Sequence, residues 1–147
     1  MGLTADLGRG RTGIDTSVFI YFIEEDPRFL PLIEPLFKDA DEGRRELVAS
    51  ALTLLEVMVV PYRAGNQALA ERYEQLLTRS RGILLIDLSR DQLRTAAQLR
   101  ATAGMKTPDA LQLAAALTAG CTTFLTNDRR IPAVSGMRVL QLVDYVT

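Results

Sequence analysis

The chain has 147 residues, of which 48% are hydrophobic, and its formal net charge is −1. This length and apolar content predict one compact domain over residues 1–147, with a core of ordinary size. The chain contains no histidine, which excludes Ser-His-Asp hydrolysis, paired-histidine ribonuclease catalysis and zinc sites built on histidine.

The first half of the chain alternates short apolar runs with helical patterns. Residues 1–11 are polar and contain glycine, which predicts a loose N-terminal arm. Thr16 or Ser17 is the expected N-cap of the first helix after the arm, and Ser50 has the position of a second N-cap. The predicted elements are a strand that ends at Ile14, helices over 18–23 and 29–38, a strand over 46–49, and helices over 52–60 and 66–78.

The second half repeats the alternation more regularly. The run Ile83–Ile86 is apolar throughout, which is typical of a parallel strand buried on both faces. Ser89 and Gly104 have the positions of helix caps, and Thr107 with Pro108 predicts the start of a helix that Gly120 ends. Strands are expected over 123–125 and 139–142. Strands interleaved with helices predict right-handed crossovers and a parallel sheet covered on both faces.

Four acidic residues lie where these segments begin, end or turn. Asp15 and Asp128 each follow a predicted strand, Asp109 lies in the first turn of a helix, and Glu56 lies about two turns into another. Ligands of open parallel sheets collect at the carboxyl ends of strands, so we expect the four to converge. Carboxylates gathered in this way repel one another unless a cation neutralises them, and hard oxygen ligands favour Mg²⁺ or Mn²⁺.

Each acid also has a structural explanation. The helix macrodipole stabilises any acid in a first turn, which accounts for Asp109 without a metal. Glu56 is the hardest to explain in this way, because it lies inside the apolar run Leu54–Met58, where a solvated face is difficult to find. Cys121, the only cysteine, follows a helix of small residues and is expected to be a buried, inert thiol.

The acids and their flanking residues resemble the four motifs of the PIN domain family. These motifs are Ile14–Val18, Ser50–Glu56, Lys106–Ala116 and Leu125–Asp128, and the resemblance covers roughly residues 12–145. Arg11–Ile14 is more polar than the first strand usual in that family. The resemblance implies a three-layer α/β/α sandwich around a central, mainly parallel sheet of four to five strands.

The resemblance also implies a function. It suggests a divalent-metal-dependent endoribonuclease in which Asp15, Asp109, Asp128 and Glu56 are catalytic and hold one or two Mg²⁺ or Mn²⁺ ions. Such ions activate water and stabilise charge during phosphodiester hydrolysis. Thr16 and Thr126 match positions thought to hydrogen-bond the ligands or the phosphate. For a single domain of this size, the resemblance further suggests a VapC-like toxin that forms a homodimer and is inhibited by a small VapB-like antitoxin.

Basic residues near the motifs are candidates for contacts with RNA. Lys106, Arg129 and Arg130 adjoin the third and fourth motifs, where they can reach phosphates at the mouth of the site. Residues 1–60 hold 6 Lys/Arg and 11 Asp/Glu, whereas residues 61–147 hold 11 and 7, so a basic face beside an acidic site is compatible with the composition. Locally biased surface composition explains these counts as well.

Several alternatives stay open at this point. The chain can be a PIN-like nuclease outside a toxin pair, or a scaffold that binds RNA or protein without cleaving it. A receiver-like phosphoryl-transfer domain also gathers acids at strand ends, but it needs a lysine near the last strand, and Lys106 comes too early. No signal-peptide pattern and no apolar run of roughly 20 residues is present, so we expect a cytoplasmic protein with no membrane partner.

Overall fold

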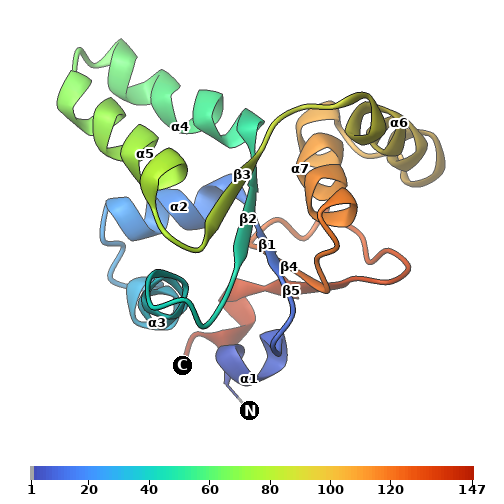
Figure 1. The fold of residues 1–147 in the computed structure, drawn as a ribbon, viewed down its shortest axis with the longest axis horizontal. Coiled ribbons are helices and arrows are strands. Elements are labelled where there is room, and N and C mark those ends of the chain that lie inside the picture. Colours follow the sequence, from blue (N-terminus) through green and yellow to red (C-terminus); the bar gives the residue numbers. More distant parts are fainter. Residues whose placement is uncertain (1) are drawn as a thin grey trace.

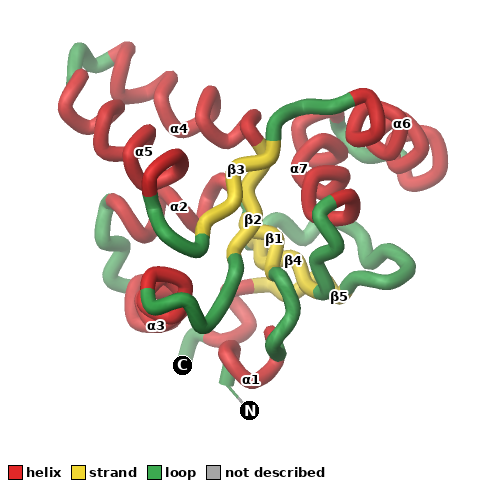
Figure 2. Tube along the Cα trace, viewed as in Figure 1, coloured by secondary structure: helices red, strands yellow, loops and turns green. Residues whose placement is uncertain are grey.

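A five-stranded sheet forms the centre of the protein, seen in a computed structural model that describes residues 2–147 (Figures 1 and 2). The strand order is β3-β2-β1-β4-β5, and every neighbouring pair is parallel. The strands are β1 (Thr12–Ile14), β2 (Leu47–Ser50), β3 (Ile83–Ile86), β4 (Thr123–Thr126) and β5 (Arg138–Gln141). All carboxyl ends therefore meet at one edge of the sheet.

Helices cover both faces of this sheet (Figure 1). On one face, α7 (Thr107–Thr118) packs on β1 and β2, and α6 (Arg90–Ala103) packs on α7. The opposite side carries α2 (Thr16–Ile23), α3 (Leu30–Asp41), α4 (Ala51–Arg63) and α5 (Gln67–Arg79), with α1 (Leu3–Leu7) against α3 and a final 3₁₀ turn over Leu142–Tyr145. The predicted three-layer α/β/α sandwich with a parallel sheet is confirmed.

The polar first strand is buried in spite of its composition. Thr12 is fully buried on β1, and its hydroxyl is hydrogen-bonded to the Thr123 hydroxyl on β4 at 2.9 Å. A buried hydroxyl that has a partner costs little. Gly13 lies between α7 and the sheet, where an added Cβ would stand 2.6 Å from the Ala116 Cβ and 2.7 Å from a Phe124 ring carbon. Only glycine at this position allows α7 to lie this close to the central strand.

The N-terminal arm, the end of one helix and the start of another differ from the sequence predictions. Residues 3–7 form α1 with Leu3 and Leu7 buried, so the prediction of a loose arm is wrong there, and Met1 lies outside the described residues. The helix predicted over 52–60 continues through Pro61 to Arg63. The helix expected to start with a Thr107 cap has Lys106 as its N-cap instead. Each difference reflects tertiary contacts or cap geometry that residue type alone does not specify.

The run Ile83–Ile86 forms a strand, but it is not buried on both faces. It is the edge strand β3, and only Ile83 among its residues is buried. The Ser50 and Ser89 caps are confirmed, since each side chain accepts a backbone N–H of its helix. Cys121 is buried, and burial raises the pKa of its thiol to about 12, in agreement with an inert role.

Candidate active site

Asp15 stands at the junction of the central strand and α2. It is the N-cap of α2, in place of the predicted Thr16 or Ser17, and its Oδ1 accepts the Thr16 N–H at 2.7 Å. Its Oδ2 accepts the Thr126 hydroxyl at 2.5 Å. The same Thr126 oxygen accepts the backbone N–H of Asp128 at 3.0 Å. Thr126 therefore connects the acid after β1 to the acid after β4.

Asp128 is paired with a nearby arginine. The Arg130 guanidinium donates to both carboxylate oxygens, from Nε at 2.9 Å and from Nη2 at 2.8 Å. The Arg130 backbone N–H also donates to Oδ1 at 2.9 Å. These hydrogen bonds hold the pKa of Asp128 below its ordinary value of 3.8. In this arrangement the carboxylate of Asp128 already has a cationic partner.

Asp109 lies in the first turn of α7, directly after Pro108. Among residues 2–147 its carboxylate has no hydrogen-bond partner. Burial raises its pKa above the ordinary value, and the negative charges of Asp128 and Glu56 raise it further, against the opposing charge of Arg130. The surroundings of Asp109, in the first turn of α7, therefore disfavour its ionised form.

Glu56 extends from α4 into a cluster of uncharged donors. Its Oε1 accepts the Thr16 hydroxyl at 2.8 Å and the Gln112 side-chain N–H at 2.8 Å. The Gln112 amide also donates to the Thr16 and Thr53 hydroxyls at 2.8 and 3.0 Å. The sequence predictions omitted Gln112 and Thr53. Their signal was a polar side chain one helical turn from an acid, in the pairs Asp109–Gln112 and Thr53–Glu56.

Hydrogen bonds and sheet topology place the four acids in one region, and their charges affect one another. Burial raises the pKa of Asp15, opposed by hydrogen bonds from Thr126 and Thr16, and the charges of Asp109 and Glu56 raise it further. Asp109 is in turn coupled to Asp128 and Glu56. A divalent cation would relieve this repulsion. The structure therefore brings the four predicted acids together at the carboxyl edge of the sheet.

The donor set suits a hard cation, although the side chains are turned to other partners. Among residues 2–147, no three Asp, Glu or Cys side chains stand close enough to share one ion as they are arranged. The Asp128 carboxylate faces Arg130, whereas Oε2 of Glu56 and the Asp109 carboxylate have no hydrogen-bond partner within that part of the chain. Oxygen-only ligands of this kind fit Mg²⁺ or Mn²⁺ once Asp128 is released from Arg130.

The remaining predicted residues lie around the same edge. Thr16 and Thr126 both hydrogen-bond the acids directly, as described above. Lys106 is exposed at the start of α7. Arg129 points to a different carboxylate from Arg130, since its guanidinium pairs with Asp144 at 2.5 Å. Of the three basic candidates, Arg130 is the one in direct contact with an acid of the site.

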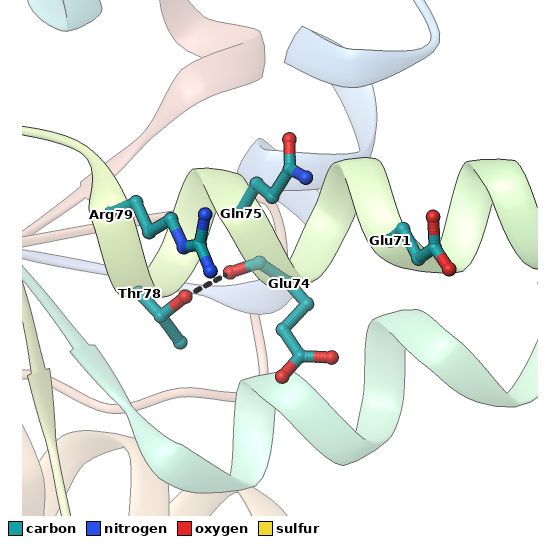
Figure 3. Close-up of a pocket in the computed structure, with 5 residues that line it drawn as sticks. All are labelled: Glu71, Glu74, Gln75, Thr78 and Arg79. Carbon is teal, nitrogen blue, oxygen red and sulfur yellow. Dashed lines mark hydrogen bonds between the residues drawn. The ribbon is translucent and has the colours of Figure 1, made fainter.

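A hollow of about 240 Å³ elsewhere on the molecule lacks the features of an active site (Figure 3). Its lining comes from α5 alone, from Glu71, Glu74, Gln75, Thr78 and Arg79. The hydrogen bond within it joins the Thr78 hydroxyl to the Glu74 carbonyl of the same helix at 2.7 Å. A catalytic site needs groups that converge from several elements, and the acidic edge of the sheet provides these.

Comparison with known families assigns the chain to a class of proteins. The family profile described as PIN domain matches residues 14–137. The chain therefore belongs to the PIN domain family, which confirms the resemblance seen in the motifs. The match begins one residue before Asp15 and includes all four acids. A search of curated proteins returned no match.

Solved structures with the same fold include chains from three bacteria. One is VapBC2 from Rickettsia felis bound to a DNA fragment from its promoter, with a TM-score of 0.68, 15% identity, and coverage of 89% of this chain and 98% of the other. A toxin-antitoxin complex from Klebsiella pneumoniae has a TM-score of 0.62, 22% identity and coverage of 88% and 95%. DNA-bound VapBC from Salmonella typhimurium has a TM-score of 0.63, 20% identity and coverage of 90% and 98%.

Within residues 2–147, no helix has the length and apolar character needed to cross a lipid bilayer.

Proposed function

We propose that this protein is a divalent-metal-dependent endoribonuclease. The observation that carries the proposal is the gathering of Asp15, Glu56, Asp109 and Asp128 at one sheet edge, with the pKa values of Asp15 and Asp109 raised by burial and by the other acids. Membership of the PIN domain family supports a nuclease. A protein that keeps four mutually repelling carboxylates together has a use for the cation that stabilises them.

The four acids and the two threonines have different roles in the proposed reaction. Asp15, Asp109, Asp128 and Glu56 would hold one or two Mg²⁺ or Mn²⁺ ions. The bound ion would activate the attacking water and neutralise charge that develops on the phosphate. Thr126 and Thr16 orient the acids by donating hydrogen bonds to Asp15 and Glu56. With no histidine in the chain, the imidazole route to general base catalysis is absent.

Basic residues at the same edge provide contacts for the RNA backbone. Arg130 lies against Asp128 and is largely exposed, so an incoming phosphate can recruit its guanidinium. Lys106 at the start of α7 and Arg129 add positive charge nearby. Single-stranded loops of structured RNA are the proposed substrate, because their bases can be splayed out for cleavage.

We further propose that the protein acts as a VapC-like toxin with a small VapB-like antitoxin as its inhibitor. The support is the shared fold with chains from complexes that are described as VapBC or toxin-antitoxin assemblies. A stable complex with the product of a small adjacent reading frame, together with loss of RNA cleavage in that complex, would test this assignment. A nuclease that finds no such inhibitor would act outside a toxin pair.

The exposed apolar face of α4 supports a homodimer. Leu55 and Tyr62 are 62% and 57% exposed, and with Leu54, Met58 and Val59 they border a mostly apolar hollow of about 340 Å³. Contiguous exposed apolar surface of this kind marks interaction sites. We expect the wild type to run as a dimer in light scattering and Leu55→Glu to run as a monomer. A monomeric wild type would contradict this expectation.

The nuclease itself is tested by incubating the purified protein with total RNA, with Mg²⁺ or with EDTA. We expect cleavage only with Mg²⁺, and a loss of more than about 100-fold for Asp15→Asn and Asp109→Asn, beyond the upper range for residues that only support ligands. Asp91→Asn is the matched control, because Asp91 is also a first-turn acid but is exposed on α6 and paired with Arg94.

Three results would overturn the proposal. Folded Asp15→Asn and Asp109→Asn proteins that cut RNA as fast as the wild type would remove the acids from the mechanism. Cleavage that continues unchanged in EDTA would show that the reaction does not depend on a metal ion. Binding of RNA without any cleavage under all conditions would instead indicate a non-catalytic scaffold.

A further inference from the structure

A single amide lies buried in the otherwise apolar middle of α7. Gln112 is 3% exposed, and the four residues after it, Leu113–Ala116, are fully buried apolar residues of the core. Burying an amide costs free energy unless its polar atoms find partners. The hydrogen-bond partners of Gln112 therefore indicate why an amide is present at this buried position.

All of those partners lie beside Glu56. The two N–H groups of Gln112 Nε2 are shared among three acceptors, Glu56 Oε1 and the Thr16 and Thr53 hydroxyls, at 2.8, 2.8 and 3.0 Å. Its Oε1 accepts from the Thr53 hydroxyl at 3.3 Å. The reverse orientation of the amide would place a carbonyl oxygen against the carboxylate of Glu56, and two acceptors repel each other. Glu56 thus determines which way the amide faces.

These hydrogen bonds join the two helical layers. Gln112 belongs to α7 on one side of the sheet, whereas Thr16, Thr53 and Glu56 belong to α2 and α4 on the other side (Figure 1). The contact between α4 and α7 is made at the acidic edge, where β1 and β2 end. Gln112 therefore fixes Glu56 relative to Asp109, which lies one turn earlier on the same α7 helix.

The hydrogen bonds occupy only one oxygen of Glu56. Oε1 accepts both the Thr16 hydroxyl and the Gln112 amide, while Oε2 has no hydrogen-bond partner among residues 2–147. Both donors are uncharged, so they hold the carboxylate in place without neutralising it. A cationic donor at this position would reduce the attraction of Glu56 for a metal ion.

We propose that Gln112 is a positioning residue for metal binding: its amide holds one oxygen of Glu56 and leaves the other, with the full charge of the carboxylate, for a divalent ion. This inference rests on the proposed metal-dependent function. It assigns to Gln112 a role beyond packing, carried through Glu56, with Thr53 supporting the amide.

A second buried glutamine provides a matched control. Gln92 on α6 is 2% exposed, and its Nε2 donates to the Asp87 carbonyl at 2.6 Å. None of its hydrogen bonds reaches an acid of the site. Replacing either glutamine by methionine removes a buried amide and keeps the side-chain length. Both variants should lose thermal stability, but only one should lose affinity for metal.

The test measures Mn²⁺ binding by titration calorimetry, with thermal unfolding in EDTA as a separate measure of the fold. We expect Gln112→Met to bind Mn²⁺ about tenfold more weakly than the wild type, a loss typical of groups that orient a metal ligand. Gln92→Met should bind as the wild type does. If Gln112→Met fails to fold, Gln112→Asn replaces it, since the shorter side chain withdraws the amide from Glu56 while staying polar.

A double variant separates positioning from general damage. In a Glu56→Gln background, Gln112→Met should cause no further loss of Mn²⁺ affinity, because the residue through which it acts is already changed. An equal additional loss in that background would overturn the proposal. So would unchanged Mn²⁺ binding by Gln112→Met in a protein whose wild type binds Mn²⁺. A wild type that binds no Mn²⁺ would overturn the metal-dependent function first, and the inference with it.

Discussion

Glu56 and Asp128 are two carboxylates of one site that are held in opposite ways. Uncharged donors, the Thr16 hydroxyl and the Gln112 amide, bind one oxygen of Glu56. Arg130 binds both oxygens of Asp128 through a guanidinium and adds its backbone N–H. The first arrangement fixes a carboxylate and keeps its charge. The second supplies a counterion within the chain.

The difference indicates how repulsion among the four carboxylates is reduced in the absence of a metal ion. The Arg130 charge lowers the pKa of Asp128 and opposes the increase in the pKa of Asp109. Arg130 thus stabilises part of the acidic cluster, and under the proposed function a divalent ion would replace it. Because the Arg130 side chain is 69% exposed, solvent weakens the pair and the exchange is inexpensive. We therefore interpret Glu56 as a carboxylate that is already positioned to bind an ion, and Asp128 as one that must exchange its arginine partner for the ion.

The largest expected effect compares the two carboxylates directly. Glu56→Gln should weaken Mn²⁺ binding by about 10- to 100-fold, because it removes a charge that nothing else in the site neutralises. Asp128→Asn should weaken binding less, by a few-fold, since removing Asp128 also frees the binding ion from competition with its arginine. Titration calorimetry on the wild type and the two variants measures their Mn²⁺ affinities. Equal losses of Mn²⁺ affinity in the two variants would contradict this distinction between Glu56 and Asp128.

The reciprocal change removes the counterion. Arg130→Ala should strengthen Mn²⁺ binding by about two- to fivefold, in keeping with the modest energy of an exposed ion pair. Arg129→Ala is the control, because the neighbouring arginine pairs with Asp144 outside the acidic cluster. If Arg130→Ala binds Mn²⁺ more weakly than the wild type, the arginine assists the ion and does not compete with it.

The smallest effect is on the stability of the metal-free protein. The raised pKa of Asp109 means that its stabilising contribution is full below pH 3.8 and is lost as the pH rises through the raised value. In EDTA at pH 7, Asp109→Asn should therefore melt above the wild type, and this advantage should disappear below pH 3.8. Mg²⁺ at pH 7 should reverse the order. Differential scanning calorimetry checks these shifts, with Asp91→Asn as the control.

Much of the fold could be predicted from local patterns. The continuous apolar run of β3, the Ser50 and Ser89 caps and the Gly104 end of α6 follow from residue type and spacing. The N-terminal arm could not, because α1 has only five residues and is held by burying Leu3 and Leu7 in the tertiary core. The edge position of β3 also depends on strand order, which an apolar run does not specify.

The candidate site divides in a similar way. Asp15, Glu56, Asp109 and Asp128 were found from motifs and from strand ends, since a parallel sheet brings those ends to one edge. Gln112 and Thr53 were missed, because their only signal, a position one helical turn from an acid, does not show which side chains they contact. Arg130 was predicted to contact phosphate, and its present partner is the acid two residues earlier.

The sequence by itself determined the chemistry available to this protein: four acids at strand and helix ends, oxygen ligands for a hard cation, and no histidine. These are properties of residue type and order along the chain. Only the tertiary structure decided which oxygen of each acid is free and which donor holds the other. Those relations join α2, α4 and α7 across the edge of the sheet, and contacts between residues as distant as Thr16 and Gln112 form only when both layers pack.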